Sequence, residues 1–231
     1  MPSFLEAPVA GAYHVLTSLV DILQPLTGAY AAVIAIVLCT LVVRLCLVPL
    51  SVRAQRGLKA RAALMPQLKQ LSEKHRGDPE RLQREVAKLQ AESGTSLFAG
   101  FLPMLAQLPF FWLMYTLFSR TVVAGEPNQL ISGSLLGAPL GVHWPVATGT
   151  PAFLVVAVLL AVVAWFSARL QVRQLETSAT TGAPVSTWSR RIAQLLPFGT
   201  LLTAAFVPLA AGLYLLTTTT WTVVERTILQ R

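Results

Sequence analysis

Thirty-three consecutive residues, 192–224, carry no charged side chain, and further apolar runs lie at 29–50, 97–118 and 151–168. About 20 apolar residues are enough for a helix to cross the hydrocarbon core of a bilayer. Only 12% of the residues are charged, whereas about a quarter is usual in a soluble domain. The runs are continuous and do not alternate, which argues against a transmembrane β-barrel. The sequence therefore predicts an all-α polytopic membrane protein.

The run 192–224 is too long for one span and too short for two full ones. A single helix of this length would measure about 50 Å, against a core of about 30 Å. Its midpoint, Val207-Pro208-Leu209-Ala210-Ala211-Gly212, has the residues of a turn. We therefore expect two short spans joined by a tight turn, which makes five spans in all.

The distribution of basic residues predicts the orientation of these spans. Residues 1–43 and 121–168 contain no Lys or Arg, whereas 53–88 contain ten and Arg169, Arg173, Arg190 and Arg191 follow the third run. Basic segments stay on the cytoplasmic side, so the N-terminus is expected outside and the C-terminus inside. The predicted segments are an external amphipathic segment 1–28, a first span 29–51, a cytoplasmic helical hairpin 52–96, a second span 97–119, an external loop 120–150, a third span 151–168, a cytoplasmic loop 169–191, a fourth span 192–207, a turn and fifth span 208–226, and a cytoplasmic tail 227–231.

The segment 52–96 is the one long stretch of polar sequence, and its pattern is helical. Apolar residues recur at helical spacing on both sides of Gly77-Asp78-Pro79. Asp78 suits an N-cap and Pro79 suits the first helical position. We expect two helices with short apolar stripes and a basic exterior. The alternative is a solvated loop that only follows the charge rule.

Several kinds of chemistry have no counterpart in the sequence. There is no phosphate-binding loop, no His/Cys cluster with metal spacing, no Gly-x-Ser-x-Gly elbow and no carboxylate inside any of the four apolar runs. These absences argue against an ATPase, a zinc protease, a serine hydrolase and a proton-coupled carrier. We expect no catalytic residue, no cofactor, no metal and no sequence-specific recognition of nucleic acid.

Three polar residues inside spans are the candidate site. Arg44 lies in the first span, Thr40 lies one turn before it on the same face, and Gln107 lies in the middle of the second span. Charges inside a membrane usually face a wet cavity, so these residues are expected to line one. Alternatively, Arg44 extends to the cytoplasmic headgroups and Gln107 makes an interhelical hydrogen bond. The threonines 217–220 and 222 are expected to bond to backbone carbonyls.

At these positions the sequence resembles the YidC/Oxa/Alb family of membrane protein insertases, in the short bacterial form without a large external domain. Val43-Arg44-Leu45-Cys46-Leu47-Val48-Pro49-Leu50 is similar to the end of the family's first core span. Met65-Pro66-Gln67-Leu68-Lys69, Leu102 to Phe111, and Pro208 with Gly212-Leu213 resemble its hairpin start, next span and final hairpin, in order. The resemblance covers about residues 12–229.

The resemblance implies five helices around a hydrophilic groove that opens to the cytoplasm and the lipid. It implies an insertase and chaperone of the bacterial cytoplasmic membrane that inserts nascent membrane proteins without ATP, with the ribosome and the Sec translocon as candidate partners. Arg44 matches the family's groove arginine and Thr40 its polar neighbour. The family's aromatic pair in the last helix is replaced by Leu216 and Thr217, and we place the nearest aromatic residues, Tyr214 and Trp221, on different faces. The alternatives are a structural or chaperone subunit of a larger membrane complex and a small-solute carrier.

Overall fold

The computed structural model describes residues 6–93, 102–123, 125–144, 150–179 and 187–229, and this part of the chain is mostly helical. The elements are α1 (Glu6–Thr27), η2 (Gly28–Tyr30), α2 (Ala31–Lys74), α3 (Pro79–Ser93), α4 (Leu102–Ser119), β1 (Val122–Val123), β2 (Glu126–Pro127), η3 (Gln129–Ser132), β3 (Ser134–Leu135), β4 (Ala138–Pro139), α5 (Pro151–Ala179), α6 (Thr187–Leu195), η4 (Leu196–Phe198), α7 (Gly199–Phe206) and α8 (Leu209–Leu229).

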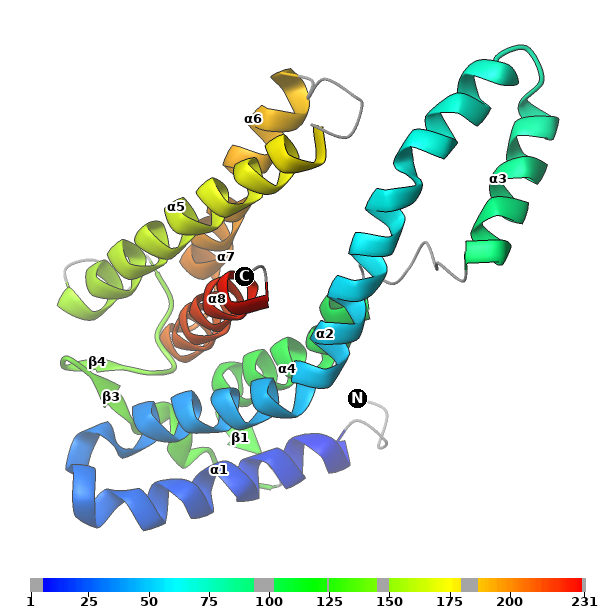
Figure 1. The fold of residues 1–231 in the computed structure, drawn as a ribbon. Coiled ribbons are helices and arrows are strands. Elements are labelled where there is room, and N and C mark those ends of the chain that lie inside the picture. Colours follow the sequence, from blue (N-terminus) through cyan, green and yellow to red (C-terminus); the bar gives the residue numbers. More distant parts are fainter. Residues whose placement is uncertain (1–5, 94–101, 124, 145–149, 180–186, 230–231) are drawn as a thin grey trace.

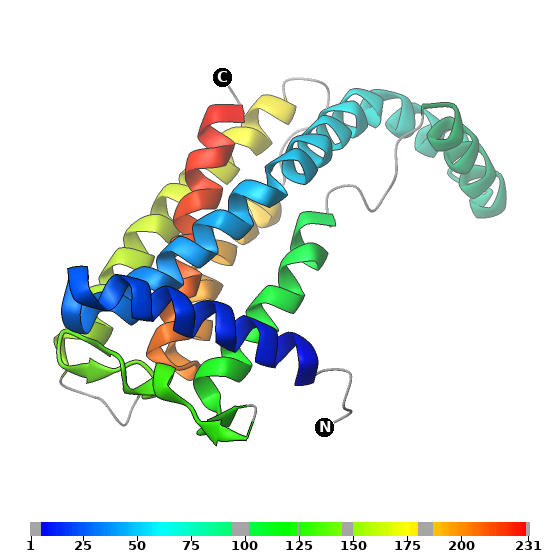
Figure 2. The same cartoon turned by 90° about the horizontal axis from the view of Figure 1, so that it is seen from below.

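Helix α8 is the centre of the bundle. It packs against α2 on one side, against α5 and α7 on another, and against α4. Its residues 209–215 are all buried, and the small residues Ala210, Ala211 and Gly212 at its start let neighbouring helices approach closely. Figures 1 and 2 show α2, α4, α5 and α8 running through the bundle, while α1 lies across one end beside the short strands.

Helix α1 and the segment 122–143 together cover that end of the bundle. Val9, Tyr13 and Leu16 form the buried stripe of α1, whereas Val15, Ile22 and Leu26 are exposed. Two antiparallel pairs, β1 with β2 and β3 with β4, follow α4. The expected external loop 120–150 had no predicted element, because strands of two residues are too short to produce a periodic pattern.

Two helical boundaries differ from the expected ones. Helix α2 continues without interruption from the apolar run into the polar segment, through Pro49 and Pro66, and it changes direction along its length (Figure 1). The end of an apolar run marks a membrane boundary and does not by itself end a helix. The expected fourth span is divided into α6, η4 and α7, since Pro197 stands in the short 3₁₀ turn. The turn expected at Pro208 is present between α7 and α8, where Val207 is extended.

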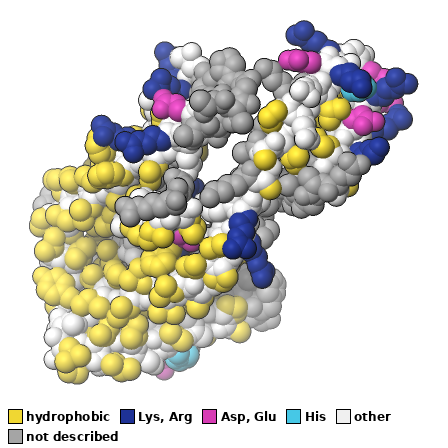
Figure 3. All heavy atoms as spheres, in the orientation of Figure 1, with side chains coloured by type: hydrophobic (Ala, Val, Ile, Leu, Met, Phe, Trp, Pro, Cys, Tyr) yellow, Lys and Arg dark blue, Asp and Glu magenta, His cyan; other side chains and the backbone are white. Residues whose placement is uncertain are grey.

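The surface separates into an apolar block and basic ends. Figure 3 shows hydrophobic side chains over the bundle and Lys and Arg gathered over the far ends of the α2–α3 and α5–α6 pairs. Within the described residues, two helical stretches, Glu6–Gly57 and Pro151–Glu176, are long and apolar enough to cross a membrane, and Leu108–Ser119 is a shorter apolar helix. Helix α8, with its many threonines, is not among these two.

Candidate functional site

The site forms where α2 and α8 cross. Arg44 lies on the side of α2 that faces α8 and is only 9% exposed. Its Nε atom donates a hydrogen bond to Thr218 Oγ1 at 2.7 Å, and its Nη2 atom donates to the Thr218 carbonyl oxygen at 3.2 Å. Thr218 is itself 2% exposed. A single residue of α8 therefore satisfies two guanidinium donors of a buried charge.

Thr218 is the threonine of α8 that contacts Arg44. Thr217, Thr219, Thr220 and Thr222 donate to carbonyl oxygens three or four residues earlier in their own helix, as expected. The Thr218 hydroxyl accepts a hydrogen bond from Arg44. The sequence offered no signal for this contact, because which threonine meets the arginine depends on how far α2 and α8 are displaced along each other.

Thr40 shares the buried side of α2 with Arg44. It is 3% exposed and its hydroxyl donates to the Ile36 carbonyl oxygen at 2.7 Å. Its polar atom is therefore occupied by its own helix backbone, which is the usual role of a threonine inside a helix. Thr40 and Arg44 therefore lie on one face of α2, but the Arg44 guanidinium bonds to Thr218.

The side of α8 that carries Thr218 bears two further polar groups, and the sequence interpretation missed both. Trp221 Nε1 and Glu225 Oε1 are buried and have no hydrogen-bond partner among the atoms that the structure describes. Trp221 follows Thr218 by about one helical turn and Glu225 by about two. Polar groups therefore continue along α8 from Thr218 toward its C-terminal end.

The two aromatic residues of α8 lie on one side of the helix, so their expected placement on different faces was wrong. Tyr214 and Trp221 are seven residues apart, close to two full turns. Tyr214 is buried, and its ring lies 6.4 Å from that of Phe111 in α4. Phe111 stacks in turn on Tyr115 at 6.4 Å. Aromatic contacts thus connect α8 to α4 beside the arginine.

Gln107, the third candidate residue, lies in α4, but its side chain falls outside the described part of the structure. Among the described residues, no group of three His, Cys, Asp or Glu side chains could hold a metal ion.

The covered end of the bundle is fastened by hydrogen bonds around Asn128. This residue is 5% exposed. Its amide nitrogen donates to the carbonyl oxygens of Leu117 and Arg120, and its Oδ1 atom accepts from the Leu130 amide. The last carbonyls of a helix lack partners within it, so Asn128 caps the C-terminal end of α4. Leu140 and Val142 accept from the first amides of α8. This end is closed by packed chain.

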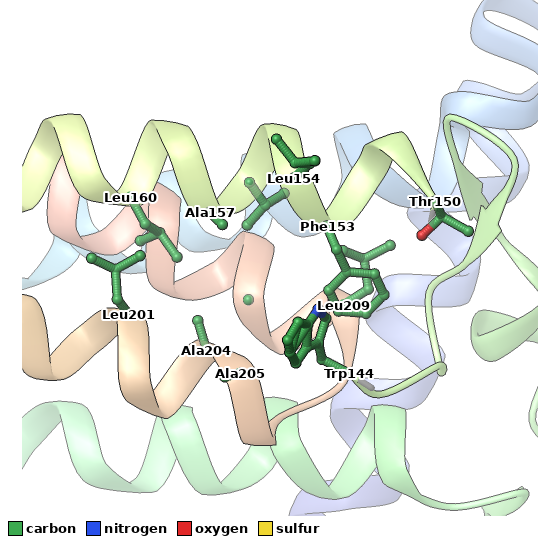
Figure 4. Close-up of a pocket in the computed structure, with 12 residues that line it drawn as sticks. Trp144, Thr150, Phe153, Leu154, Ala157, Leu160, Leu201, Ala204, Ala205 and Leu209 are labelled. Atoms are coloured by element: carbon green, nitrogen blue, oxygen red, sulfur yellow. The ribbon is translucent and has the colours of Figure 1, made fainter. Parts of the chain in front are cut away.

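Three further cavities, formed by described residues, lie away from the Arg44–Thr218 contact. An apolar one of about 520 Å³ separates α5 from α7 and the start of α8, with Trp144 beside it (Figure 4). A basic one of about 430 Å³ lies between the C-terminal half of α5 and α6 with η4. A polar one of about 370 Å³ lies between α2 and α3. None of these three is lined by Arg44.

Comparisons with known proteins find one family and several relatives. Residues 22–231 match the family model described as 60Kd inner membrane protein. A membrane protein insertase YidC of Mycolicibacterium paratuberculosis is 28% identical over 207 residues, which covers 74% of this chain and 59% of the relative. One from Mycobacterium tuberculosis is 27% identical, covering 74% of this chain and 57% of the relative. One from Streptomyces avermitilis is 33% identical over 110 residues, which covers 48% of this chain and 26% of the relative. The chain thus spans between a quarter and three fifths of the length of these relatives.

Proposed function

This chain belongs to the 60Kd inner membrane protein family, the family of the YidC and Oxa1 proteins, and on that premise we propose that it inserts nascent membrane proteins into the bilayer without ATP, through a wet groove beside Arg44. Its relatives bear the name membrane protein insertase. The observation that carries the proposal is the buried Arg44, bonded to Thr218 in the middle of an apolar bundle.

The charge distribution supports an orientation for the proposed spans. Apolar side chains cover the bundle and basic side chains gather at the far ends of α2–α3 and α5–α6 (Figure 3). With those ends in the cytoplasm, the Asn128 end faces outside, the N-terminus is outside and the C-terminus is inside. Five spans, formed by parts of α2, α4, α5, α6–α7 and α8, then surround a groove closed on the outside by packed chain.

Arg44 would recruit the acidic flank of a client. A charged side chain near the centre of a bilayer costs about 2.5–3.5 kcal/mol on insertion scales. Thr218 offsets part of this cost with two neutral oxygen atoms. A hydrogen bond from a positively charged donor to a carboxylate is about twice as strong as one between neutral groups. An acidic residue of a client entering the groove would therefore gain a partner that lipid cannot offer.

The driving force would come from the client and requires no nucleotide. Moving an apolar segment from water into lipid yields about 25 cal/mol per Å² of apolar surface. The barrier is the polar flank that must cross with it. Trp221 Nε1 and Glu225 Oε1 are buried polar atoms that lack partners within the described protein. Water or the polar flank of a client would supply those partners when it enters the groove.

The α2–α3 pair would make the first contact on the cytoplasmic side. Helix α3 packs against the end of α2, and the cavity between them is lined by Gln67, Gln70, Lys74, Glu85 and Lys88 with two leucines. A mixed polar and apolar surface of this kind suits a partly unfolded client, and the basic exterior suits ribosomal RNA phosphates.

The test is insertion into liposomes that contain only the purified protein and no nucleotide. Two clients would be compared, one with an acidic translocated flank and one in which the same flank is neutral. We expect Arg44→Lys to keep most of the activity toward both, and Arg44→Ala to lose at least about tenfold toward the acidic client only, since a bond to a charged group contributes about 1.5–3 kcal/mol.

The matched control is Arg53→Ala, which removes a charge from an exposed position on the same helix and should change neither client. Equal losses toward both clients in Arg44→Ala would show that Arg44 has a structural role alone. Insertion that requires added nucleotide would reject the ATP-independent mechanism.

A further inference from the structure

The basic cavity between α5 and α6 is separate from the Arg44 site and is built from three arginines. Arg169 and Arg173 come from α5 and Arg190 comes from α6, and Trp165 and Phe198 form its apolar wall. Arg169 and Arg173 are four residues apart, so they lie above one another on the same face of α5. The cavity of about 430 Å³ is therefore basic on two sides.

Two contacts hold its side chains in place. Arg190 Nη2 lies 2.9 Å from Glu176 Oε1, an ion pair that joins α6 to α5. The Arg169 guanidinium carbon lies 3.7 Å from the centre of the Trp165 ring, which is a cation–π contact. The Arg169 guanidinium thus lies over the face of the Trp165 ring, and the N–H groups at the edge of the guanidinium can donate hydrogen bonds in its plane.

The charges in the cavity do not balance. Three guanidinium groups face one carboxylate, that of Glu176, which leaves an excess of two positive charges. Arginine forks match phosphate oxygens in two-point hydrogen bonds. The chemistry of the cavity therefore suits a phosphate group.

The surroundings of the cavity indicate a lipid as the source of that phosphate. Trp165 is 42% exposed and Phe198 38%, while Leu195 and Leu196 beside them are 69% and 67% exposed. Exposed apolar side chains next to arginines, with a tryptophan between them, are typical of the membrane–water interface. Leu160 lines the apolar cavity shown in Figure 4. Along α5, Arg169 lies about 14 Å beyond Leu160. This distance is close to half the thickness of the hydrocarbon core of a bilayer, which is about 30 Å.

We propose that the α5–α6 cavity binds the phosphate headgroup of an anionic lipid of the cytoplasmic leaflet. Basic cavities between transmembrane helices on the cytoplasmic side are known to bind such headgroups. Arg169 and Arg173 hold the phosphate, Trp165 and Phe198 contact the glycerol and the start of the tails, and Glu176 keeps Arg190 positioned. The proposal rests on the orientation given above and does not depend on the insertase activity.

The test measures lipid retention by the purified full-length protein in detergent, using native mass spectrometry. Phosphatidylglycerol is the probe and phosphatidylcholine is the neutral comparison. We expect the protein to prefer phosphatidylglycerol. Arg169→Gln with Arg173→Gln should weaken its binding about thirtyfold, since each basic residue near an anionic surface contributes about a fivefold effect.

Two matched variants separate a site from a general charge effect. Arg81→Gln with Arg84→Gln removes the same charge from exposed positions of α3 and should leave binding unchanged. Glu176→Gln raises the positive excess in the cavity and should tighten phosphatidylglycerol binding up to about fivefold. A folding defect cannot produce tighter binding.

Three outcomes would overturn the proposal. Equal weakening by the α3 pair would mean that only net charge matters. Equal retention of the two lipids would mean that the headgroup is not recognised. Full displacement of phosphatidylglycerol by millimolar inorganic phosphate would mean that the cavity is a site for free anions.

Discussion

Arg44 shows how much a single residue in a span reveals and how much it leaves open. An arginine in an apolar run is costly enough that its importance is evident from the sequence. Its partner is not, because Thr218 is one of several similar threonines in α8 and 174 positions away along the chain. Trp221 and Glu225 were missed for the same reason, since their burial depends on the contact between α2 and α8.

The Arg44–Thr218 contact gives a prediction at this scale. Thr218→Val removes the hydroxyl that accepts from Arg44 Nε and should lower the free energy of unfolding in detergent by about 1.5–3 kcal/mol, the usual value for a bond to a charged group. Thr220→Val is the control, because Thr220 is exposed and bonds within its own helix. Comparable destabilisation by both variants would contradict the special role of Thr218.

Among the elements, the long apolar helices follow from the sequence and the connecting segments do not. The turn at Pro208 was predictable because proline cannot continue the preceding helix. The strands between α4 and α5 were not, because they are held by Asn128 and by contacts with α1, α2 and α8 and not by a local pattern. The sequence did not predict that α2 continues from Ala31 to Lys74. A fall in hydropathy indicates where a chain leaves the membrane, whereas a helix ends where its backbone hydrogen bonds end.

The packed external end gives a prediction at the scale of elements. A β-carbon added at Gly133 would lie 2.7 Å from Cβ of Ala32 in α2, so Gly133→Ala forces β3 away from the start of α2. Overpacking of this kind costs about 1–3 kcal/mol. Thermal unfolding in detergent should show the loss. Gly11→Ala in α1, where nothing lies within 4 Å, should be neutral or stabilising; an equal loss there would remove the steric explanation.

The α2–α3 pair should depend on the cap at its tip. The Asp78 Oδ1 atom accepts from the Arg81 amide at 3.0 Å, and loss of such a cap costs about 1 kcal/mol. Asp78→Ala should therefore speed amide exchange in α3 about fivefold, measured by hydrogen–deuterium exchange, while exchange in α8 stays unchanged. Glu73→Gln, at an exposed position of α2, serves as the control. Unchanged exchange in α3 of Asp78→Ala would contradict a stabilising role for this cap.

For the whole molecule, the orientation rests on where charge collects, and labelling can test it. Single cysteines at Ser72 and Ser132, both exposed, would be placed in a chain from which Cys39 and Cys46 are removed. A thiol reagent that cannot cross membranes should label position 132 in intact cells and position 72 only after the membrane is opened. Labelling of position 72 in intact cells would reverse the proposed topology.

In the proposed mechanism, clients pass along the side of α8 that carries Thr218. A photo-crosslinking phenylalanine derivative at Trp221, one turn from Thr218, tests it directly in liposomes engaged with a nascent client. The matched control position is Phe166, a 49% exposed aromatic residue of α5. We expect client crosslinks from position 221 and lipid crosslinks alone from position 166. Lipid crosslinks alone from position 221, or equal client crosslinks from both positions, would contradict this mechanism.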